Sequence, residues 1–473
     1  MNSQASNTIQ DPSSFRDKVA TVDKHGKRLW MFPHKPKGKL YNARALVSIL
    51  YLVVFFGLPF VKYDGHPLFL LNILERKFIL FGQIFWPQDF FIFGLGMILF
   101  IVFIALFTVV FGRIFCGWAC PQTVFMEMVF RRVEYLIEGD GPKQKMLKQG
   151  PWNAEKIARK LTKWTAFWII SFIIANTFLA YVIGVDQLEK MISEPLGKNL
   201  GTFTSLCTFT TVFFFVYSWL REQVCTVICP YGRMQGVLLD RNSIVVAYDY
   251  KRGEERGKFK KNETRTLGDC IDCAQCVKVC PTGIDIRNGT QLECINCTAC
   301  IDACNHMMEA VGLSKGLIRY ASEEDIANKK KLRFTGRMKA YTAVMCVLLG
   351  VEVFLLASRS DVGVNILRTP GQLFQQQPDH QISNLYNYKL LNKTFKNKEV
   401  TFRPENFEGT IKLVGETKLT IPKDSYATGS MFIYMNDKDV TKRKTQLRIG
   451  VYEGNEKIRT ITTSFLGPFG GGM

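Results

Sequence analysis

The feature that most constrains this chain is a run of eight cysteines in residues 270–304, CIDCAQCVKVC in the first half and CINCTACIDAC in the second. Each half has the spacing C-x2-C-x2-C-x3-C, as in bacterial two-cluster ferredoxins. In that pattern three close thiolates bind one [4Fe–4S] cluster, and the last cysteine of each half binds the other cluster. Two alternatives are weaker. Disulfides would require an oxidising compartment. Zinc sites favour two separated C-x2-C pairs rather than this doubled spacing.

The cysteine run therefore predicts two [4Fe–4S] clusters with crossed ligands. The first cluster is assigned to Cys270, Cys273, Cys276 and Cys304. The second is assigned to Cys294, Cys297, Cys300 and Cys280. Asn305 stands where the first half has Pro281, a difference that removes no ligand. Thiols of this kind must stay reduced, so the run is expected to face the cytosol. Its acidic residues, Asp302 among them, are interpreted as aiding solubility and as tuning the cluster potential through their charge.

The rest of the chain has the composition of a membrane protein with soluble parts. It contains 37 Phe and is 47% hydrophobic, yet 22% of its residues are charged. A helix needs about 20 apolar residues to cross a bilayer. Five runs are predicted to do so: 45–61, 90–111, 164–183, 203–220 and 340–357. The apolar segment 68–86 is interrupted by charges and is expected to lie on the outer membrane surface.

The basic residues predict the orientation of the spans. Residues 15–44 hold nine Lys or Arg and residues 112–163 hold ten, whereas 62–89 hold three and 184–202 hold two. The positive-inside rule then places the N-terminus and residues 221–339 in the cytosol of a bacterial cell, with the chain in the cytoplasmic (inner) membrane. This distribution explains the net charge of +20, and no nucleic-acid motif accompanies it, so no nucleic acid is expected as a partner.

The segment after the last span is predicted to be all-β and periplasmic. It has no cysteine and shows seven short alternating runs separated by turn residues. These runs are 386–391, 399–403, 410–414, 418–421, 430–435, 446–452 and 458–465. Seven short strands in a domain of this size indicate an immunoglobulin-like sandwich, with residues 362–382 as its linker.

The expected fold class is a multi-domain membrane protein with a five-span α-helical region, an α+β ferredoxin domain and a C-terminal all-β immunoglobulin-like sandwich. The expected domains are a basic cytosolic tail (1–44), four spans (45–240), the ferredoxin domain (241–339), the fifth span (340–357) and the outer sandwich (358–473).

A second chemical motif occurs twice, just after the second and fourth spans. The two sequences are FCGWACPQT and VCTVICPYG, and each contains C-x3-C-P. We call the four residues Cys116, Cys120, Cys225 and Cys229 the membrane-edge cysteines. Two diverged copies of a two-span unit explain the repetition. A helix would place the sulfurs of each pair one turn apart, and a turn would aim backbone N–H groups at them.

The chemistry expected of the membrane-edge cysteines is catalytic and metal-binding. Soft thiolates suit Cu(I), zinc or iron–sulfur iron, and they also support dithiol–disulfide cycling. Cys207 and Cys346 stand alone inside spans and are interpreted as packing residues. Most of the arginines near the motifs are interpreted as orientation signals that contact lipid headgroups. They are Arg113, Arg131, Arg132, Arg221 and Arg233.

Taken together, the motifs FCGWACPQT, VCTVICPYGRMQG, the cysteine run and GLIRY, with five spans and a terminal sandwich, resemble the family of the cytochrome c oxidase accessory protein CcoG, also called FixG or RdxA. The resemblance covers residues 28–473. It implies a membrane-bound polyferredoxin that passes electrons through two clusters to reduce Cu(II) to Cu(I), a cupric reductase for assembly of the cbb type of cytochrome c oxidase. It also implies that the cysteine run holds the clusters and that the membrane-edge cysteines form the thiol site.

Two other functions remain open from the sequence. One is a quinol-coupled electron carrier to a periplasmic reductase, and the other is a cluster-stabilised assembly scaffold. The expected partners are the lipid bilayer, a cytosolic electron donor, and haem–copper oxidase assembly factors or copper carriers.

Overall fold

A computed structural model describes residues 21–22, 25, 27–63, 65–73, 76–260, 266–329, 335–378, 380–415, 419–440 and 442–468. The chain forms two compact units, which are described separately below. The cysteine unit comprises Met1–Leu58, Met97–Ala180 and Asp186–Leu349. The sandwich unit comprises Pro59–Gly96, Tyr181–Val185 and Gly350–Met473. The first 20 residues of the expected basic tail lie outside the described residues.

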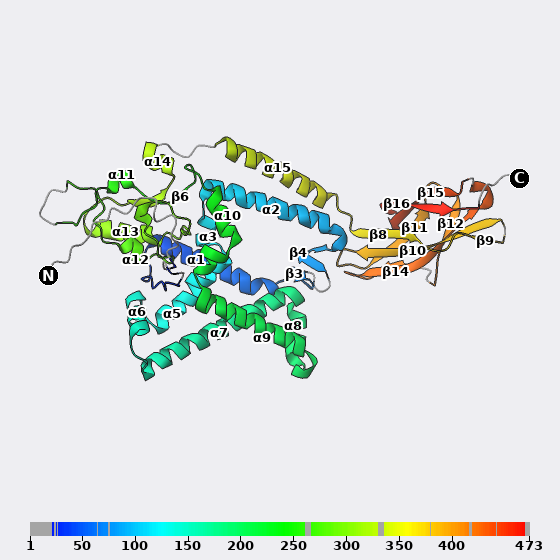
Figure 1. Cartoon of the computed structure of the whole chain (residues 1–473). Coiled ribbons are helices and arrows are strands. Elements are labelled where there is room, and N and C mark those ends of the chain that lie inside the picture. Colours follow the sequence, from blue (N-terminus) through cyan, green and yellow to red (C-terminus); the bar gives the residue numbers. More distant parts are fainter. Residues whose placement is uncertain are drawn as a thin grey trace. The chain divides into compact units, whose positions relative to one another are not determined.

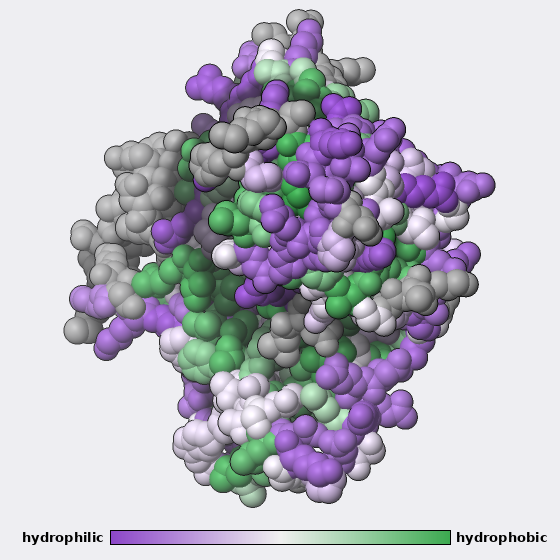
Figure 2. Space-filling model, turned by 90° about the vertical axis from the view of Figure 1, so that its right-hand side faces the viewer, coloured by the Kyte–Doolittle hydropathy of each residue, from purple (hydrophilic) through white to green (hydrophobic). Residues whose placement is uncertain are grey.

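Five helices in the described part of the chain are long and apolar enough to cross a membrane, which confirms the five predicted spans (Figure 1). They are α1 (Lys39–Gly57), α2 (Phe90–Phe111), α7 (Ala154–Ile183), α9 (Leu200–Phe215) and α15 (Gly336–Ala357). The span that begins with α9 continues through a π-helical turn to Leu220. Their outward faces carry large apolar side chains, such as Phe103 and Val347, that are about half exposed or more. Apolar and hydrophilic side chains gather in separate patches on the face drawn in Figure 2. A helix that is apolar on all sides is suited to lipid rather than to water.

Helix α7 begins ten residues before the predicted span at 164 because its charged first turns are stabilised by ion pairs. Lys160 and Lys163 lie 2.7 and 2.8 Å from Glu138. Pairing allows Lys163 to be buried and Lys160 to be partly buried at the start of the helix.

Short helices follow the second and fourth spans in the cysteine unit. After α2 come α3 (Ile114–Trp118), α4 (Pro121–Thr123), the π-helix η3 (Val124–Phe130), α5 (Arg131–Ile137) and α6 (Gly141–Gln149). Between α7 and α9 lie α8 (Val185–Ser193) and η4 (Leu196–Lys198), and after α9 come the π-helices η5 (Val216–Leu220) and η6 (Val224–Ile228) and the helix α10 (Pro230–Leu238). π-Helical turns are rare and often occur at functional sites.

The ferredoxin domain of the cysteine unit is a small α+β fold. Strand β6 (Val245–Tyr248) pairs antiparallel with β7 (Ile318–Ala321). The helices are α11 (Tyr250–Gly253), α12 (Gln275–Lys278), η7 (Ile286–Asn288), α13 (Ala299–Ala310) and α14 (Glu323–Asn328). Ile286, Met308 and Leu317 are almost fully buried in a core that also contains cysteines of the run.

The segment between the first two spans belongs to the sandwich unit and forms strands rather than a helix. After η1 (Leu58–Phe60), β1 (Lys62–Tyr63) pairs with β2 (His66–Pro67). Strands β3 (Phe69–Asn72), β4 (Lys77–Leu80) and β5 (Gln83–Phe85) form an antiparallel sheet that ends in η2 (Pro87–Asp89). Ile79 and Ile84 are fully buried, and Phe395 of the C-terminal domain packs against them.

The C-terminal domain is a two-sheet sandwich, as predicted. One sheet has the order β12-β14-β10-β8, with β9 also paired to β10, and the other has the order β13-β11-β15-β16. The strands are β8 (Val362–Arg368), β9 (Gln375–Gln377), β10 (Gln381–Asn392), β11 (Lys398–Pro404), β12 (Gly409–Leu413), β13 (Leu419–Ile421), β14 (Tyr426–Asn436), β15 (Lys444–Glu453) and β16 (Glu456–Leu466), with the turn η8 (Asp437–Asp439) before β15.

Both sheets contribute to one core, which fixes their face-to-face packing. Tyr386 of β10 is fully buried and donates a hydrogen bond to the Ser464 carbonyl of β16 over 2.9 Å. The linker predicted at 362–382 is wrong, because β8 and β9 lie in it and pair with β10. Lys418, at the start of one predicted strand, lies outside the described residues.

Candidate functional site

The two halves of the cysteine run adopt the same local backbone. In each half the residues before and after the middle cysteine have positive φ: Asp272 and Ala274 around Cys273, and Asn296 and Thr298 around Cys297. Residues other than glycine rarely adopt a positive φ, so its recurrence in both halves indicates a backbone geometry that the site requires. Successive turns of this kind aim backbone N–H groups into a concavity that suits negative charge.

Backbone donors do point at the sulfurs. The N–H groups of Asn296 and Ala299 donate to the sulfurs of Cys294 and Cys297. Hydrogen bonds to sulfur are among the features that set the potential of an iron–sulfur cluster.

Cysteines of one half of the run interact with cysteines of the other half. Cys304, from the second half, interacts electrostatically with Cys270 and Cys273, and Cys276 interacts with Cys304. Cys280, from the first half, interacts with three cysteines of the second half, namely Cys294, Cys297 and Cys300. Cys300 also interacts with Cys276 of the first set, so these contacts do not separate the two sets, and the crossed assignment stays a prediction.

The surroundings of these cysteines fit iron–sulfur clusters. A cavity lies among Cys276, Cys280, Cys294, Cys297 and Cys300, walled by apolar side chains. Burial raises the pKa of Cys294 to about 12 and that of Cys297 to about 11. Thiols of this acidity hold their protons at neutral pH, so metal binding must displace protons, as it does at metal–thiolate sites generally.

The two C-x3-C-P motifs share the conformation of their second cysteine, whereas Cys116 lies in the α-helix α3 and Cys225 in the π-helix η6. Cys120 and Cys229 are extended, and each is the N-cap of a helix whose first residue is proline. A residue before proline is driven to extended conformations, and proline suits the first position of a helix. The Gly232 N–H donates to the Cys229 sulfur over 3.4 Å, so this cysteine caps its helix.

The membrane-edge cysteines come together from the two repeats. The Cys116 sulfur donates to Gln235 Oε1 of α10 over 2.9 Å, and Gln235 is fully buried. Cys225 interacts electrostatically with Cys116, Cys120 and Cys229. Burial raises the pKa of Cys116 to about 11 and that of Cys225 to about 12. The repeat thus brings four soft ligands into one buried region.

Within the described residues, no three His, Cys, Asp or Glu side chains converge closely enough to hold a single metal ion. This is true of the cysteine run as well, where each thiolate of a cluster binds a different iron atom. The membrane-edge cysteines are therefore a gathering of thiols rather than a preformed site for one ion.

The second half of the cysteine run lies directly against the first C-x3-C-P motif. A Cβ atom on Gly117 would lie 2.5 Å from the Ile295 carbonyl oxygen and 2.8 Å from that of Asn296. Cys116 and Cys297 belong to one buried apolar cluster that also contains Ile295. Only glycine permits the backbone at residue 117 to lie this close to the backbone of Ile295 and Asn296. A single layer of packed atoms therefore separates the two thiol sites.

Polar contacts fix the same junction. Trp118 Nε1 donates to the Tyr320 hydroxyl over 3.1 Å, and that hydroxyl donates to the Asn296 carbonyl over 3.3 Å. Asp302, which the sequence does not predict to have a structural role, accepts hydrogen bonds from the N–H groups of Leu40 (3.3 Å) and Tyr41 (2.8 Å) at the start of α1. Its carboxylate joins the ferredoxin domain to the first span.

Arg113 is a functional candidate that the sequence interpretation missed. Only 3% exposed, it hydrogen-bonds to the Cys116 sulfur, donates to the Leu292 carbonyl and acts electrostatically on Cys294. The interpretation as a lipid-contacting residue is therefore wrong for Arg113. Its cation lies between the membrane-edge cysteines and the cysteine run, where it offsets negative charge on both.

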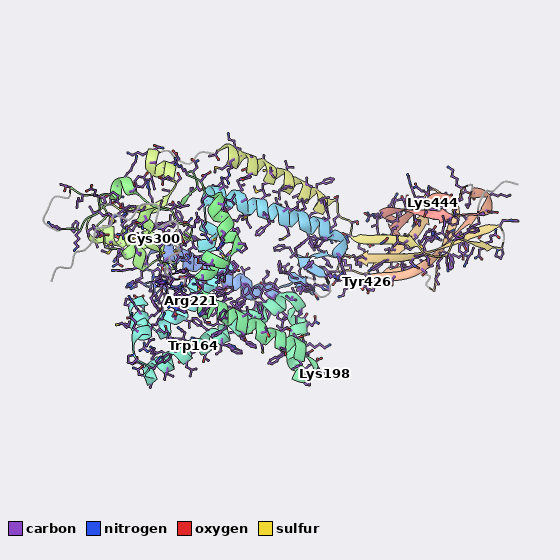
Figure 3. The ribbon with its side chains drawn as sticks, viewed as in Figure 1. Trp164, Lys198, Arg221, Cys300, Tyr426 and Lys444 are labelled. Carbon is purple, nitrogen blue, oxygen red and sulfur yellow. The ribbon has the colours of Figure 1, made fainter. Side chains whose placement is uncertain are left out.

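Arg131 and Arg221 are also buried rather than lipid-facing, because carboxylates surround them. Arg221, labelled in Figure 3 with Cys300 of the same unit, binds Glu134 through two hydrogen bonds of 3.1 and 2.7 Å. Arg131 lies 3.7 Å from Glu222. Burial opposes ionisation of Glu134, but Arg221 and Lys163 outweigh it and lower the pKa of Glu134 to about 2.

Known proteins agree with this architecture. Residues 220–323 match the model of a 4Fe-4S dicluster domain, and residues 93–138, which include the first C-x3-C-P motif, match a 4Fe-4S binding domain. Residues 353–468 match the Ig-like fold at the C-terminus of FixG, which confirms the immunoglobulin-like prediction. The fold and the sites thus define a multi-pass membrane iron–sulfur protein of electron transfer.

Relatives over nearly the whole chain identify the family. RdxA of Cereibacter sphaeroides is 33% identical over 440 residues, which cover 89% of this chain and 92% of RdxA. The nitrogen fixation protein FixG of Rhizobium meliloti is 31% identical and covers 82% of each chain. The chain belongs to the FixG/RdxA family. A solved FixG-related protein from Vibrio parahaemolyticus matches 24% of this chain and all of its own, with 15% identity and a TM-score of 0.21.

Proposed function

We propose that this protein carries electrons from a cytosolic donor to copper at the membrane edge and reduces Cu(II) to Cu(I) for assembly of the cbb type of cytochrome c oxidase. We assign one [4Fe–4S] cluster to Cys270, Cys273, Cys276 and Cys304. We assign the other to Cys280, Cys294, Cys297 and Cys300. The membrane-edge cysteines are the proposed thiol site for the copper substrate.

The contact of Gly117 with Ile295 and Asn296 is the observation that carries this proposal. It joins the two thiol-rich regions through packed backbone atoms, beside the buried cluster that contains Cys116 and Cys297. An electron carrier and its acceptor need such proximity. Neither a scaffold nor a ferredoxin that serves only a soluble partner would require it.

The residues of the chain have distinct roles in this proposal. When bound, the clusters supply one electron for each Cu(II) that is reduced. Thiolates at Cys116, Cys120, Cys225 and Cys229 favour Cu(I) over Cu(II), so they draw the reduction forward. The buried cation of Arg113 offsets the negative charge that accumulates on both sides of the junction. Asp302 keeps the ferredoxin domain against α1 through its two hydrogen bonds.

The proposed topology has the cysteine run and the basic loops in the cytosol and the sandwich in the periplasm. The support is the excess of Lys and Arg in residues 15–44 and 112–163 over the other two loops. The proposed partners are a cytosolic electron donor and, outside, oxidase assembly factors or copper carriers.

The test is a double substitution, Cys116→Ser with Cys120→Ser, in protein purified without oxygen. We expect about eight iron atoms per chain, as two cubane clusters require, but a loss of copper binding and of cluster oxidation by Cu(II). The matched control is Cys207→Ser with Cys346→Ser, which removes two thiols from the spans α9 and α15. Copper reduction at the wild-type rate in the first variant would contradict the proposal.

The same preparation distinguishes the quinol-coupled alternative. Clusters reoxidised by a quinone at the wild-type rate in both double variants, and unaffected by Cu(II), would favour a quinone partner. Iron near four atoms per chain would remove one of the two cluster assignments.

A further inference from the structure

A basic pocket lies in the sandwich unit where the ends of two spans meet the C-terminal domain. It has a volume of about 260 Å³. Its described lining includes four cations and a single carboxylate: Arg359, Lys389, Lys393, Arg459 and Asp89. A water molecule occupies about 30 Å³ in the liquid, so the pocket has room for a group much larger than water.

The carboxylate does not neutralise the pocket. Asp89 accepts hydrogen bonds from Arg359 Nη2 and Lys393 Nζ, each over 2.6 Å. Burial favours the protonated form of Asp89, but the two cations outweigh it and lower the pKa of this residue. One negative charge is thus shared by two of the four cations, and an excess of positive charge remains.

One buried donor in the pocket lacks a partner. The side chain of Arg359 is 9% exposed, and its Nε makes no hydrogen bond. Buried donors without partners are uncommon in native proteins, and a bound ion or water is one of the explanations for them. The guanidinium also lies 4.6 Å from the centre of the Phe85 ring, which holds it in place. A fixed guanidinium with a vacant donor suits a phosphate oxygen.

We propose that this pocket binds the phosphate of an anionic phospholipid headgroup. This inference is independent of the proposed copper chemistry. The pocket lies at the ends of two spans: Asp89 immediately precedes α2, and Arg359 follows α15 by two residues.

Lipid tails have an apolar surface beside the pocket. Phe91 of α2 is 72% exposed and Phe354 of α15 is 69% exposed, and Ile92 lines the pocket itself. A headgroup in the pocket would leave its acyl chains along these span ends. A soluble anion would make no use of this apolar surface.

Two of the cations can be removed without breaking the structure. Lys389 and Arg459 are exposed side chains on β10 and β16. Lys389 lies over the ring of Tyr426, 4.8 Å from its centre, and Figure 3 labels that tyrosine on the sandwich. A matched control removes Lys412 and Arg403, which are exposed cations over tyrosine rings elsewhere in the same domain.

The experiment uses the delipidated full-length protein in neutral detergent. Binding of short-chain phosphatidylglycerol, phosphatidylcholine and inorganic phosphate is measured by native mass spectrometry and by titration. We expect Lys389→Ala with Arg459→Ala to weaken phosphatidylglycerol binding about tenfold to thirtyfold, since each cation near an anionic lipid contributes roughly a factor of five. The control pair should bind as the wild type does, and thermal unfolding without lipid should be equal in all three proteins.

Four outcomes would overturn the inference. They are equal phosphatidylglycerol affinity in the two double variants, equal affinity of the wild type for phosphatidylcholine, competition by inorganic phosphate as strong as that by the lipid, and tighter binding of an acidic peptide than of the lipid. The last result would assign the pocket to a protein partner.

Discussion

Substituting Gly117 by alanine tests whether electrons pass through the junction between the two thiol-rich regions. The new methyl carbon would lie 2.5 Å from one carbonyl oxygen and 2.8 Å from another, whereas ordinary contacts begin near 3.4 Å. Both obstructing atoms, on Ile295 and Asn296, are backbone atoms and cannot rotate away. The two segments must therefore separate by about 1 Å. Overpacking of this kind costs about 1–3 kcal/mol, less than the stability of a typical domain.

The expected effect is on rate rather than on cluster content. Displacement by about 1 Å at a reacting centre can lower a rate by roughly a hundredfold. We expect iron content and cluster spectra to be unchanged, and oxidation of reduced clusters by Cu(II), followed in stopped flow, to slow by about tenfold to a hundredfold. The control is Gly94→Ala in α2, where a methyl group would meet no atom within 4 Å. If Gly117→Ala transfers electrons as fast as Gly94→Ala, the junction is not the route.

Three further substitutions test the charges around this junction. Arg113→Gln removes a buried cation beside the second cluster site, so the reduction potential of that cluster should fall by roughly 60–120 mV in an EPR titration. About 59 mV corresponds to a tenfold change in the equilibrium constant for one electron. Arg113→Lys keeps the charge and should restore most of the difference. Glu134 has its pKa lowered from 4.5 to about 2, so its ion pairs contribute about 3 kcal/mol above pH 4.5, and this contribution disappears as the pH falls toward 2. Glu134→Gln should therefore lower the Tm at pH 7, and the difference from wild type should shrink below pH 4.5; a difference independent of pH would refute the assignment. Asp302→Asn should weaken its hydrogen bonds to the N–H groups of Leu40 and Tyr41 by about 1–2 kcal/mol, seen as faster hydrogen exchange of these two amides with the clusters retained.

The features that local pattern controls could be predicted from the sequence. The second span was placed at 90–111, where α2 lies, because an uninterrupted apolar run ends at glycine and arginine. The spacing predicts crosswise pairing of the two halves, and in the structure the last cysteine of each half interacts with cysteines of the other half. Ligand spacing is a local property, so it can be read without knowledge of the fold.

What could not be predicted depends on contacts between distant residues. Arg113 and Arg221 follow apolar runs, as lipid-facing arginines do, and nothing nearby in sequence reveals their partners Cys294 and Glu134. Residues 362–382 include β9, a run of three Gln with no strand pattern of its own, which pairs with β10. β8 does carry alternating apolar residues at Val362, Val364 and Ile366, but the Gln and Pro that follow it favour a linker, and only its pairing with β10 identifies it as a strand.

The bond between Asp302 and the start of α1 also has a consequence for biosynthesis. The N–H groups of Leu40 and Tyr41 belong to the first turn of the first span, yet their acceptor is synthesised more than 260 residues later. At about 5–20 residues per second, the ribosome needs roughly 10–50 s to reach it. During that interval the first span must enter the bilayer with these amides bonded to water or headgroups. The ferredoxin domain thus docks on a helix that is already in the membrane. The hydrogen bonds from Leu40 and Tyr41 to Asp302 form only after the fourth span has been synthesised.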